Sequence, residues 1–182
     1  MTVLTLSHSG VAKQPERIDA AWYQRSRRFA SLPLGRVAYV EHGHGPAALF
    51  VHGYPLNSFQ WRGALERLHK HRRCIAPDVI GLGFTQTAEG QIISPETQTA
   101  MPPALLDSLR MDAVDVVGSD SGGMMSQLFL AKYPQRVRTL LLTNCEVDGN
   151  DPPPQFLEKT FEADGHPLAN MTAIDQVGSV RQ

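Results

Sequence analysis

The residues best suited to chemistry gather in one short stretch around Asp120. Gly118 and Gly122 stand two positions on either side of this aspartate, which gives the pattern Gly-x-Asp-x-Gly. Residues 114–117, three of which are valines, precede the pattern, and residues 124–133 follow it with an apolar spacing typical of a helix. We predict a buried strand, a sharp turn with Asp120 at its apex, and a helix, because small flanking residues relieve crowding at such an apex.

An aspartate lifted clear of a sheet in this way could act as a nucleophile. Aspartate side chains ordinarily have a pKa of about 3.9, so a carboxylate is charged at pH 7 and needs no base in order to attack. It suits displacement at a saturated carbon, such as that of an epoxide or an alkyl halide, and the product would be a covalent ester on Asp120. The ordinary structural alternative is an aspartate that caps the following helix. We favour the nucleophile because glycines flank Asp120 on both sides and a buried strand precedes it.

A shift of one residue along the same turn would give a serine nucleophile. Ser119-x-Ser121-x-Gly123 also places small residues around a serine. An enzyme that used Ser121 would be a serine esterase, and it would need an adjacent base to activate the hydroxyl. The spacing by itself leaves both alternatives open.

Two further motifs precede the turn, and together the three give the chain a family resemblance. The motifs are His52-Gly53-Tyr54-Pro55 and Asp78-Val79-Ile80-Gly81-Leu82-Gly83. At these spacings, over residues 22–154, the chain resembles the α/β hydrolases, in the aspartate-nucleophile branch that includes epoxide hydrolases and haloalkane dehalogenases. Turns of this family usually read Gly-x-nucleophile-x-Gly-Gly, which favours Asp120 over Ser121.

The resemblance implies roles for two backbone N–H groups. In the family, the residue after His-Gly and the residue after the nucleophile form the oxyanion hole, and here these residues are Tyr54 and Ser121. The branch usually has tryptophan after the nucleophile, and dehalogenases often have asparagine after His-Gly as a halide ligand. Because this chain departs from both patterns, the leaving group stays open. The resemblance also implies that His52 orients its loop and that Asp78 is structural.

A histidine base, and usually an acid, should follow later in the chain if the resemblance holds. His166 is a candidate for the base, with an exposed loop histidine as the ordinary alternative, and Glu146 is a candidate for the acid, with a surface carboxylate as the alternative. The family's lid and last strands are not recognisable after residues 137–143. We therefore expect a core truncated after its sixth strand, and we keep a third explanation: a non-catalytic remnant, or a module completed by a partner chain.

Short apolar runs alternate with helical patterns along the chain. We expect strands at residues 35–43, 47–51, 73–76, 114–117 and 137–143. This alternation predicts an α/β fold with a mostly parallel sheet and helices on both faces, and ligands should bind beyond the carboxyl ends of the strands. Residues 21–30 could be strand or helix. A helix should begin at Ser94, but Pro102 and Pro103 predict a kink or two short helices.

The length of the chain favours a single domain, and the family resemblance implies a small-molecule substrate. In 182 residues with a net charge of −1 we expect a mobile leader at residues 1–20, the α/β-hydrolase core at 21–150, and a polar tail or the start of a lid at 151–182. Nucleic acid and membrane are not expected partners, because the chain shows neither a long basic stripe nor a long apolar run.

The remaining expectations concern the setting of the protein. We interpret Cys74 and Cys145 as buried thiols that form no disulfide, which suggests a reducing, cytoplasmic location. No cofactor and no metal are expected. If the sheet ends with the strand at residues 137–143, the exposed apolar edge of that strand favours self-association.

Overall fold

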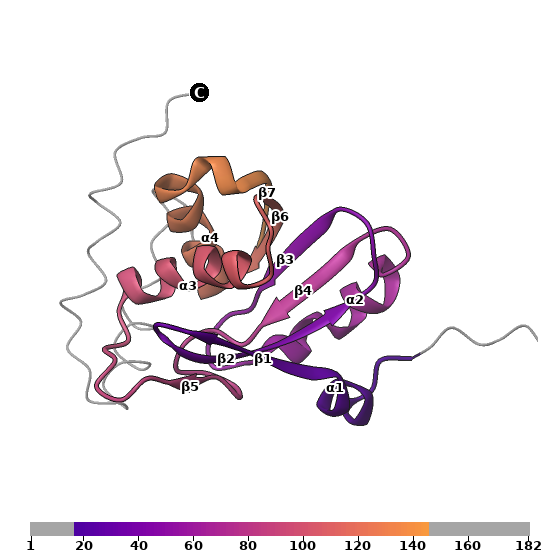
Figure 1. Cartoon of the computed structure of the whole chain (residues 1–182). Coiled ribbons are helices and arrows are strands. Elements are labelled where there is room, and N and C mark those ends of the chain that lie inside the picture. Colours follow the sequence, from indigo (N-terminus) through magenta and orange to yellow (C-terminus); the bar gives the residue numbers. More distant parts are fainter. Residues whose placement is uncertain (1–16, 146–182) are drawn as a thin grey trace, which may run out of the picture.

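The computed structural model describes residues 17–145, and a mixed seven-stranded sheet runs through them (Figure 1). The strands are β1 (Arg27–Leu32), β2 (Gly35–His42), β3 (Ala47–Val51), β4 (Arg73–Pro77), β5 (Gln86–Thr87), β6 (Val114–Ser119) and β7 (Val137–Thr143). Their order is β1-β2-β4-β3-β6-β7, and the short β5 pairs with β2. Strands β4, β3, β6 and β7 are parallel neighbours, whereas β1, β2 and β5 join through antiparallel pairs.

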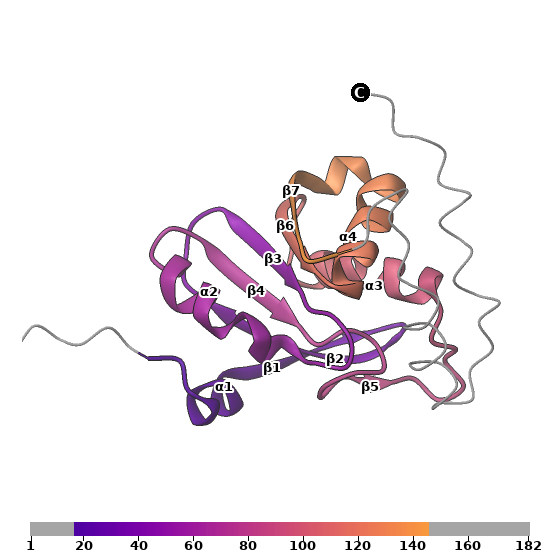
Figure 2. The same cartoon turned by 180° about the vertical axis from the view of Figure 1, so that it is seen from behind.

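Helices cover both faces of this sheet, as the α/β pattern predicted (Figures 1 and 2). They are α1 (Ala20–Ser26), α2 (Arg62–Leu68), α3 (Pro95–Ser108) and α4 (Ser121–Lys132), with 3-10 turns at Ser58–Trp61 and Pro134–Arg136. Side chains alternate across a strand, so Leu49 of β3 packs in the cluster beneath α3 and α4 while Phe50 packs with α1 and α2. Within the described residues, none of the helices is long and apolar enough to cross a membrane.

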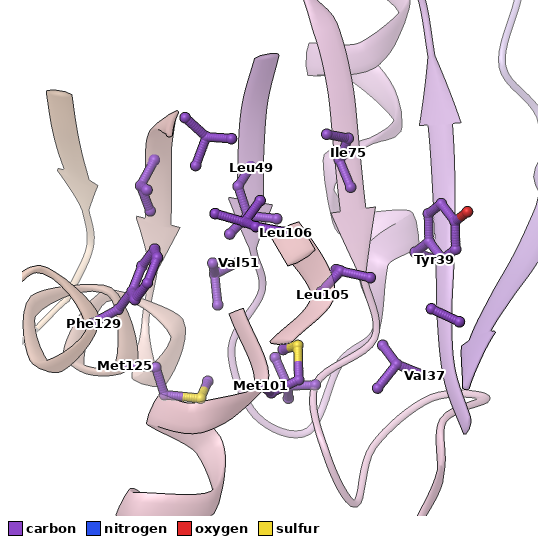
Figure 3. Packing of buried hydrophobic residues seen from close by; sticks show 14 of the residues in the cluster. Val37, Tyr39, Leu49, Val51, Ile75, Met101, Leu105, Leu106, Met125 and Phe129 are labelled. Carbon is purple, nitrogen blue, oxygen red and sulfur yellow. The ribbon is translucent and has the colours of Figure 1, made fainter. Parts of the chain in front are cut away.

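The larger apolar cluster fixes α3 and α4 against the sheet. Figure 3 shows Met101, Leu105 and Leu106 of α3 among side chains of the strands, with Phe129 of α4 beside them. All four side chains are fully buried, and each contributes roughly 1.5–3 kcal/mol relative to an exposed position. Because α4 begins at the end of β6, this packing also fixes the turn between them.

The two prolines do not divide α3. The helix runs without interruption from Pro95 to Ser108 and contains both Pro102 and Pro103, so of the two expected outcomes, a kink or two short helices, the second is wrong. Each proline removes one backbone hydrogen bond. Both are buried beside Met101 and Leu105, and this apolar packing offsets the lost bonds.

The ambiguous segment at residues 21–30 contains both structures. It is helical to Ser26 and then enters β1, which pairs with β2. Ile18 is buried, and the Asp19 side chain accepts a hydrogen bond from Trp22 N at 2.7 Å to cap α1. The folded part therefore includes residues 17–20. The rest of the predicted leader, and the tail at residues 151–182, lie outside the described residues.

Candidate active site

Asp120 lies at the apex of the turn between β6 and α4. Its backbone has φ 56° and ψ −137°, a left-handed combination that residues other than glycine rarely adopt. The Asp120 N–H points to the end of β7, where it donates to the carbonyl oxygens of Thr143 (3.3 Å) and Asn144 (3.2 Å). Ser121 is the first residue of α4 and therefore does not occupy the apex. We refer to residues 118–122 as the elbow.

The glycines of the elbow are explained by close contacts. A Cβ atom added to Gly118 would overlap the Ser126 hydroxyl and the Gly122 carbonyl oxygen. A Cβ atom added to Gly122 would overlap the carbonyl oxygens of Val51 and His52 at the end of β3. Gly118 is therefore required by the first turns of α4, and Gly122 by the backbone at the end of β3, which explains why glycine stands on both sides of the aspartate.

This packing brings the three predicted site residues together. The Ser121 N–H donates a short hydrogen bond to Asp120 Oδ1, and the Tyr54 N–H donates to Ser121 Oγ at 3.0 Å. Gly53 lies against the carboxylate, because a Cβ atom there would overlap both Cβ and Oδ1 of Asp120. The backbone N–H groups of Tyr54 and Ser121 therefore both lie beside Asp120, and both are engaged.

His52 ties the loop after β3 to the loop after β4. The ring is fully buried. Its Nε2 accepts the Val79 N–H at 3.0 Å, so Nδ1 carries the proton and donates to the Gly53 carbonyl oxygen at 2.9 Å. Burial lowers the pKa of the imidazole, which favours the neutral ring. With both nitrogens engaged in backbone contacts, His52 orients the Gly53 loop and is not placed to act as a base.

Asp78 holds the neighbouring loops through its buried carboxylate. Oδ1 accepts hydrogen bonds from the Ser58 N–H (2.8 Å) and the Ser58 hydroxyl, and Oδ2 accepts one from the Phe84 N–H (2.8 Å). A Cβ atom added to Gly83 would overlap this carboxylate. All of these contacts are internal, so Asp78 acts as a structural anchor beside the site.

The loops that follow β3 and β4 expose apolar side chains. Tyr54 and Leu56 follow β3, Phe84 follows β4, and Ile93 precedes α3; each of the four is 45–56% exposed. Such a surface suits an apolar substrate. A pocket of about 590 Å³ lies elsewhere, between the N-terminal end of α1 and residues 59–67. No elbow residue lines that pocket, so we do not assign it to this chemistry.

The remaining candidates for the base and the acid, His166 and Glu146, lie outside the described residues. Within residues 17–145, no group of three or more His, Cys, Asp or Glu side chains could hold a metal ion. Sequence reasoning also missed one feature of the site. It considered Ser121 for its N–H group or as a nucleophile, but not for the contact of its hydroxyl with Tyr54 N. That contact joins residues 67 positions apart, and no local pattern signals it.

Comparison with known proteins identifies the fold independently. A family model described as "alpha/beta hydrolase fold" matches residues 46–182, more than half of the chain. The resemblance drawn from the three motifs is therefore confirmed at the level of the family.

Three curated relatives are named for different hydrolytic reactions. The 2-hydroxy-6-oxo-2,4-heptadienoate hydrolase of Pseudomonas putida is 38% identical over 108 residues, which are 59% of this chain and 37% of that protein. Haloalkane dehalogenase 2 of Mycobacterium tuberculosis is 31% identical over 126 residues, 69% of this chain and 42% of that protein. Epoxide hydrolase 2 of Siraitia grosvenorii is 40% identical over 105 residues, 54% of this chain and 32% of that protein. The chain thus spans less than half the length of each relative.

Proposed function

The chain belongs to the α/β-hydrolase fold family, and we propose that it hydrolyses an epoxide or an alkyl halide-like substrate through a covalent ester on Asp120. The observation that carries this proposal is the backbone of Asp120, with φ 56° and ψ −137° at the apex of the elbow. Strained positions of this kind persist where the surrounding structure holds them, and they cluster at active sites. The relatives named as a haloalkane dehalogenase and an epoxide hydrolase support the substrate class.

The first chemical step forms the ester. The Ser121 N–H holds Oδ1 of Asp120, so Oδ2 is the oxygen that attacks the saturated carbon of the substrate. The bond from that carbon to the leaving group breaks, and the leaving group takes the electron pair. A halide departs as an anion, whereas an epoxide oxygen becomes an alkoxide that takes up a proton from water.

The second step hydrolyses the ester with water. Water adds to Cγ of Asp120, and the carbonyl electron pair moves onto Oδ1 beside the Ser121 N–H. Collapse of this intermediate releases the alcohol and restores the carboxylate. The step needs a general base that takes a proton from the water, and His166 stays the proposed candidate for that base.

A serine esterase that uses Ser121 is the second candidate. It is kept because the Ser121 hydroxyl lies within the same site, 3.0 Å from Tyr54 N. Two observations count against it: Ser121 stands in the first turn of α4 instead of at the apex, and both nitrogens of the nearby His52 are engaged. The third alternative remains a non-catalytic remnant, or a module completed by a partner chain.

Mass spectrometry separates these alternatives. The chain is incubated with a panel of small epoxides and haloalkanes and, separately, with a fluorophosphonate that labels activated serines. We expect an alkyl adduct, or product in solution, that is lost in Asp120→Asn and kept in Asp112→Asn, an exposed aspartate before β6. Labelling of Ser121 by the fluorophosphonate would instead support the esterase. If no reagent gives either an adduct or a product, that result would support the non-catalytic alternative.

The proposal also covers the partners, the location and the self-association of the protein. The substrate is a small molecule, and neither nucleic acid nor a membrane is a partner. Cys74 is a buried free thiol, which is consistent with a reducing cytoplasm, whereas Cys145, which was also expected to be buried, is partly exposed. In the described part of the sheet β7 pairs only with β6, and its Leu141 is 58% exposed, so this edge could support self-association. Light scattering of the wild type and of Leu141→Lys would test that, since only the wild type should associate.

A further inference from the structure

The Ser121 hydroxyl occupies a backbone group that the proposed reaction needs. The Tyr54 N–H donates to Ser121 Oγ at 3.0 Å, while the N–H of Ser121 itself donates to Asp120 Oδ1. Of the two backbone donors beside the carboxylate, one therefore faces the reacting group and the other faces a side chain of the elbow.

Cleavage of the ester calls for both donors. When a nucleophile adds to Cγ of Asp120, Oδ1 becomes an oxyanion that hydrogen-bond donors must stabilise. Gly53 lies against Oδ1 and Tyr54 is the next residue, so we take the Tyr54 N–H, to which the family resemblance gives this role, as the second donor. While the Tyr54 N–H donates a hydrogen bond to Ser121 Oγ, it can form only a weaker hydrogen bond with the oxyanion.

We propose that Ser121 is a positioning residue whose hydroxyl occupies the Tyr54 N–H by accepting its hydrogen bond. The Ser121 hydroxyl must then turn away before this N–H can stabilise the oxyanion. The inference rests on the proposed ester on Asp120. It predicts that the hydroxyl slows ester cleavage relative to ester formation. Without the hydroxyl, the rate of cleavage should rise about fivefold relative to formation, the factor that corresponds to the net worth of one neutral hydrogen bond.

The first test requires no activity. Amide hydrogen exchange at Tyr54 is measured by NMR in the wild type, in Ser121→Ala and in Ser121→Thr, which keeps the hydroxyl. We expect exchange at Tyr54 to accelerate in Ser121→Ala and to stay close to the wild-type rate in Ser121→Thr. An unchanged exchange rate at Tyr54 in Ser121→Ala would overturn the proposal that the Ser121 hydroxyl occupies this N–H.

The second test measures ester cleavage without relying on a base from the chain. The ester is formed with a reactive epoxide, and hydroxylamine is then added. The amine nitrogen attacks Cγ of Asp120, its proton passes to the departing alkoxide, and the products are the alcohol and a hydroxamate on residue 120. Intact-mass spectra of quenched samples give the rates of ester formation and of ester cleavage separately.

The proposal predicts that the ratio of cleavage to formation rises about fivefold in Ser121→Ala and returns towards the wild-type ratio in Ser121→Thr. A ratio that is unchanged or lower in Ser121→Ala would overturn it. If no variant forms an ester at Asp120, the proposed function fails. The exchange measurement alone then decides whether the Ser121 hydroxyl occupies the Tyr54 N–H.

Discussion

Replacement of Gly53 by alanine tests the packing between the His-Gly loop and the elbow. Gly53 does not have a positive φ, so alanine is compatible with its backbone. The conflict is specific: the new Cβ atom would overlap Cβ, Cγ and Oδ1 of Asp120. Rotation of the Asp120 side chain moves Cγ and Oδ1 but leaves Cβ in place, so the loop or the elbow has to shift.

Both segments resist that shift. The Asp120 N–H is bonded to the end of β7, and the Tyr54 N–H is bonded to Ser121 Oγ. Forcing an additional methyl group into packed structure costs about 1–3 kcal/mol. For a protein of this size each kcal/mol lowers the melting temperature by about 2–4 °C, so we expect a decrease of about 2–12 °C. A displacement of about 1 Å at the nucleophile should slow ester formation by about 100-fold.

The assay combines a thermal melt with the rate of ester formation on Asp120 by intact mass. Gly63→Ala is the matched control, because a Cβ atom at Gly63 would meet only Nη1 of Arg67, the end of a flexible side chain. Gly63 lies within α2, where alanine should stabilise the helix by about 0.5–1 kcal/mol. A Gly53→Ala protein that melts and reacts like the wild type would refute the contact inferred between Gly53 and Asp120.

Three further predictions concern the buried polar groups and the thiol. Asp78→Ala leaves the two donors of Ser58 without their acceptor and should lower the free energy of unfolding by roughly 2–6 kcal/mol in denaturant melts; a loss below about 1 kcal/mol would contradict the anchoring role. Burial places the pKa of folded His52 below 6.5, so only the unfolded chain gains a proton there as the pH falls. Stability should therefore decline below about pH 6.5, and the decline should be shallower in His52→Gln; equal slopes would contradict the assignment. Burial raises the pKa of the Cys74 thiol to about 11, so iodoacetamide should label Cys74 only after unfolding, as peptide mapping against Cys74→Ser would show.

Much of the fold follows from local patterns. The apolar run at residues 47–51 and the glycine-flanked Asp120 each correspond to an element that forms where it was expected. Apolar runs bounded by turn residues identify buried strands well, because each signal is contained within a few residues. The same holds for the Gly-x-Asp-x-Gly pattern, in which close contacts with α4 require Gly118 and close contacts with the backbone at the end of β3 require Gly122.

Features that depend on distant partners could not be predicted. The change from helix to strand after Ser26 is set by pairing of β1 with β2, since the local mixture of aromatic residues and arginines is compatible with both structures. Helix α3 tolerates Pro102 and Pro103 because of burial that no local propensity describes. The contact between Tyr54 and Ser121 joins two loops that only the folded sheet brings together.

The central claim is that Asp120 is the nucleophile, and peptide mapping after incubation with substrate in ¹⁸O-labelled water tests it most directly. If an ester forms and persists, the peptide that contains Asp120 should carry the mass of the alkyl group. If water cleaves the ester at Cγ, the same peptide should carry ¹⁸O in its carboxylate. Substrate turnover with neither change on Asp120 would contradict the account.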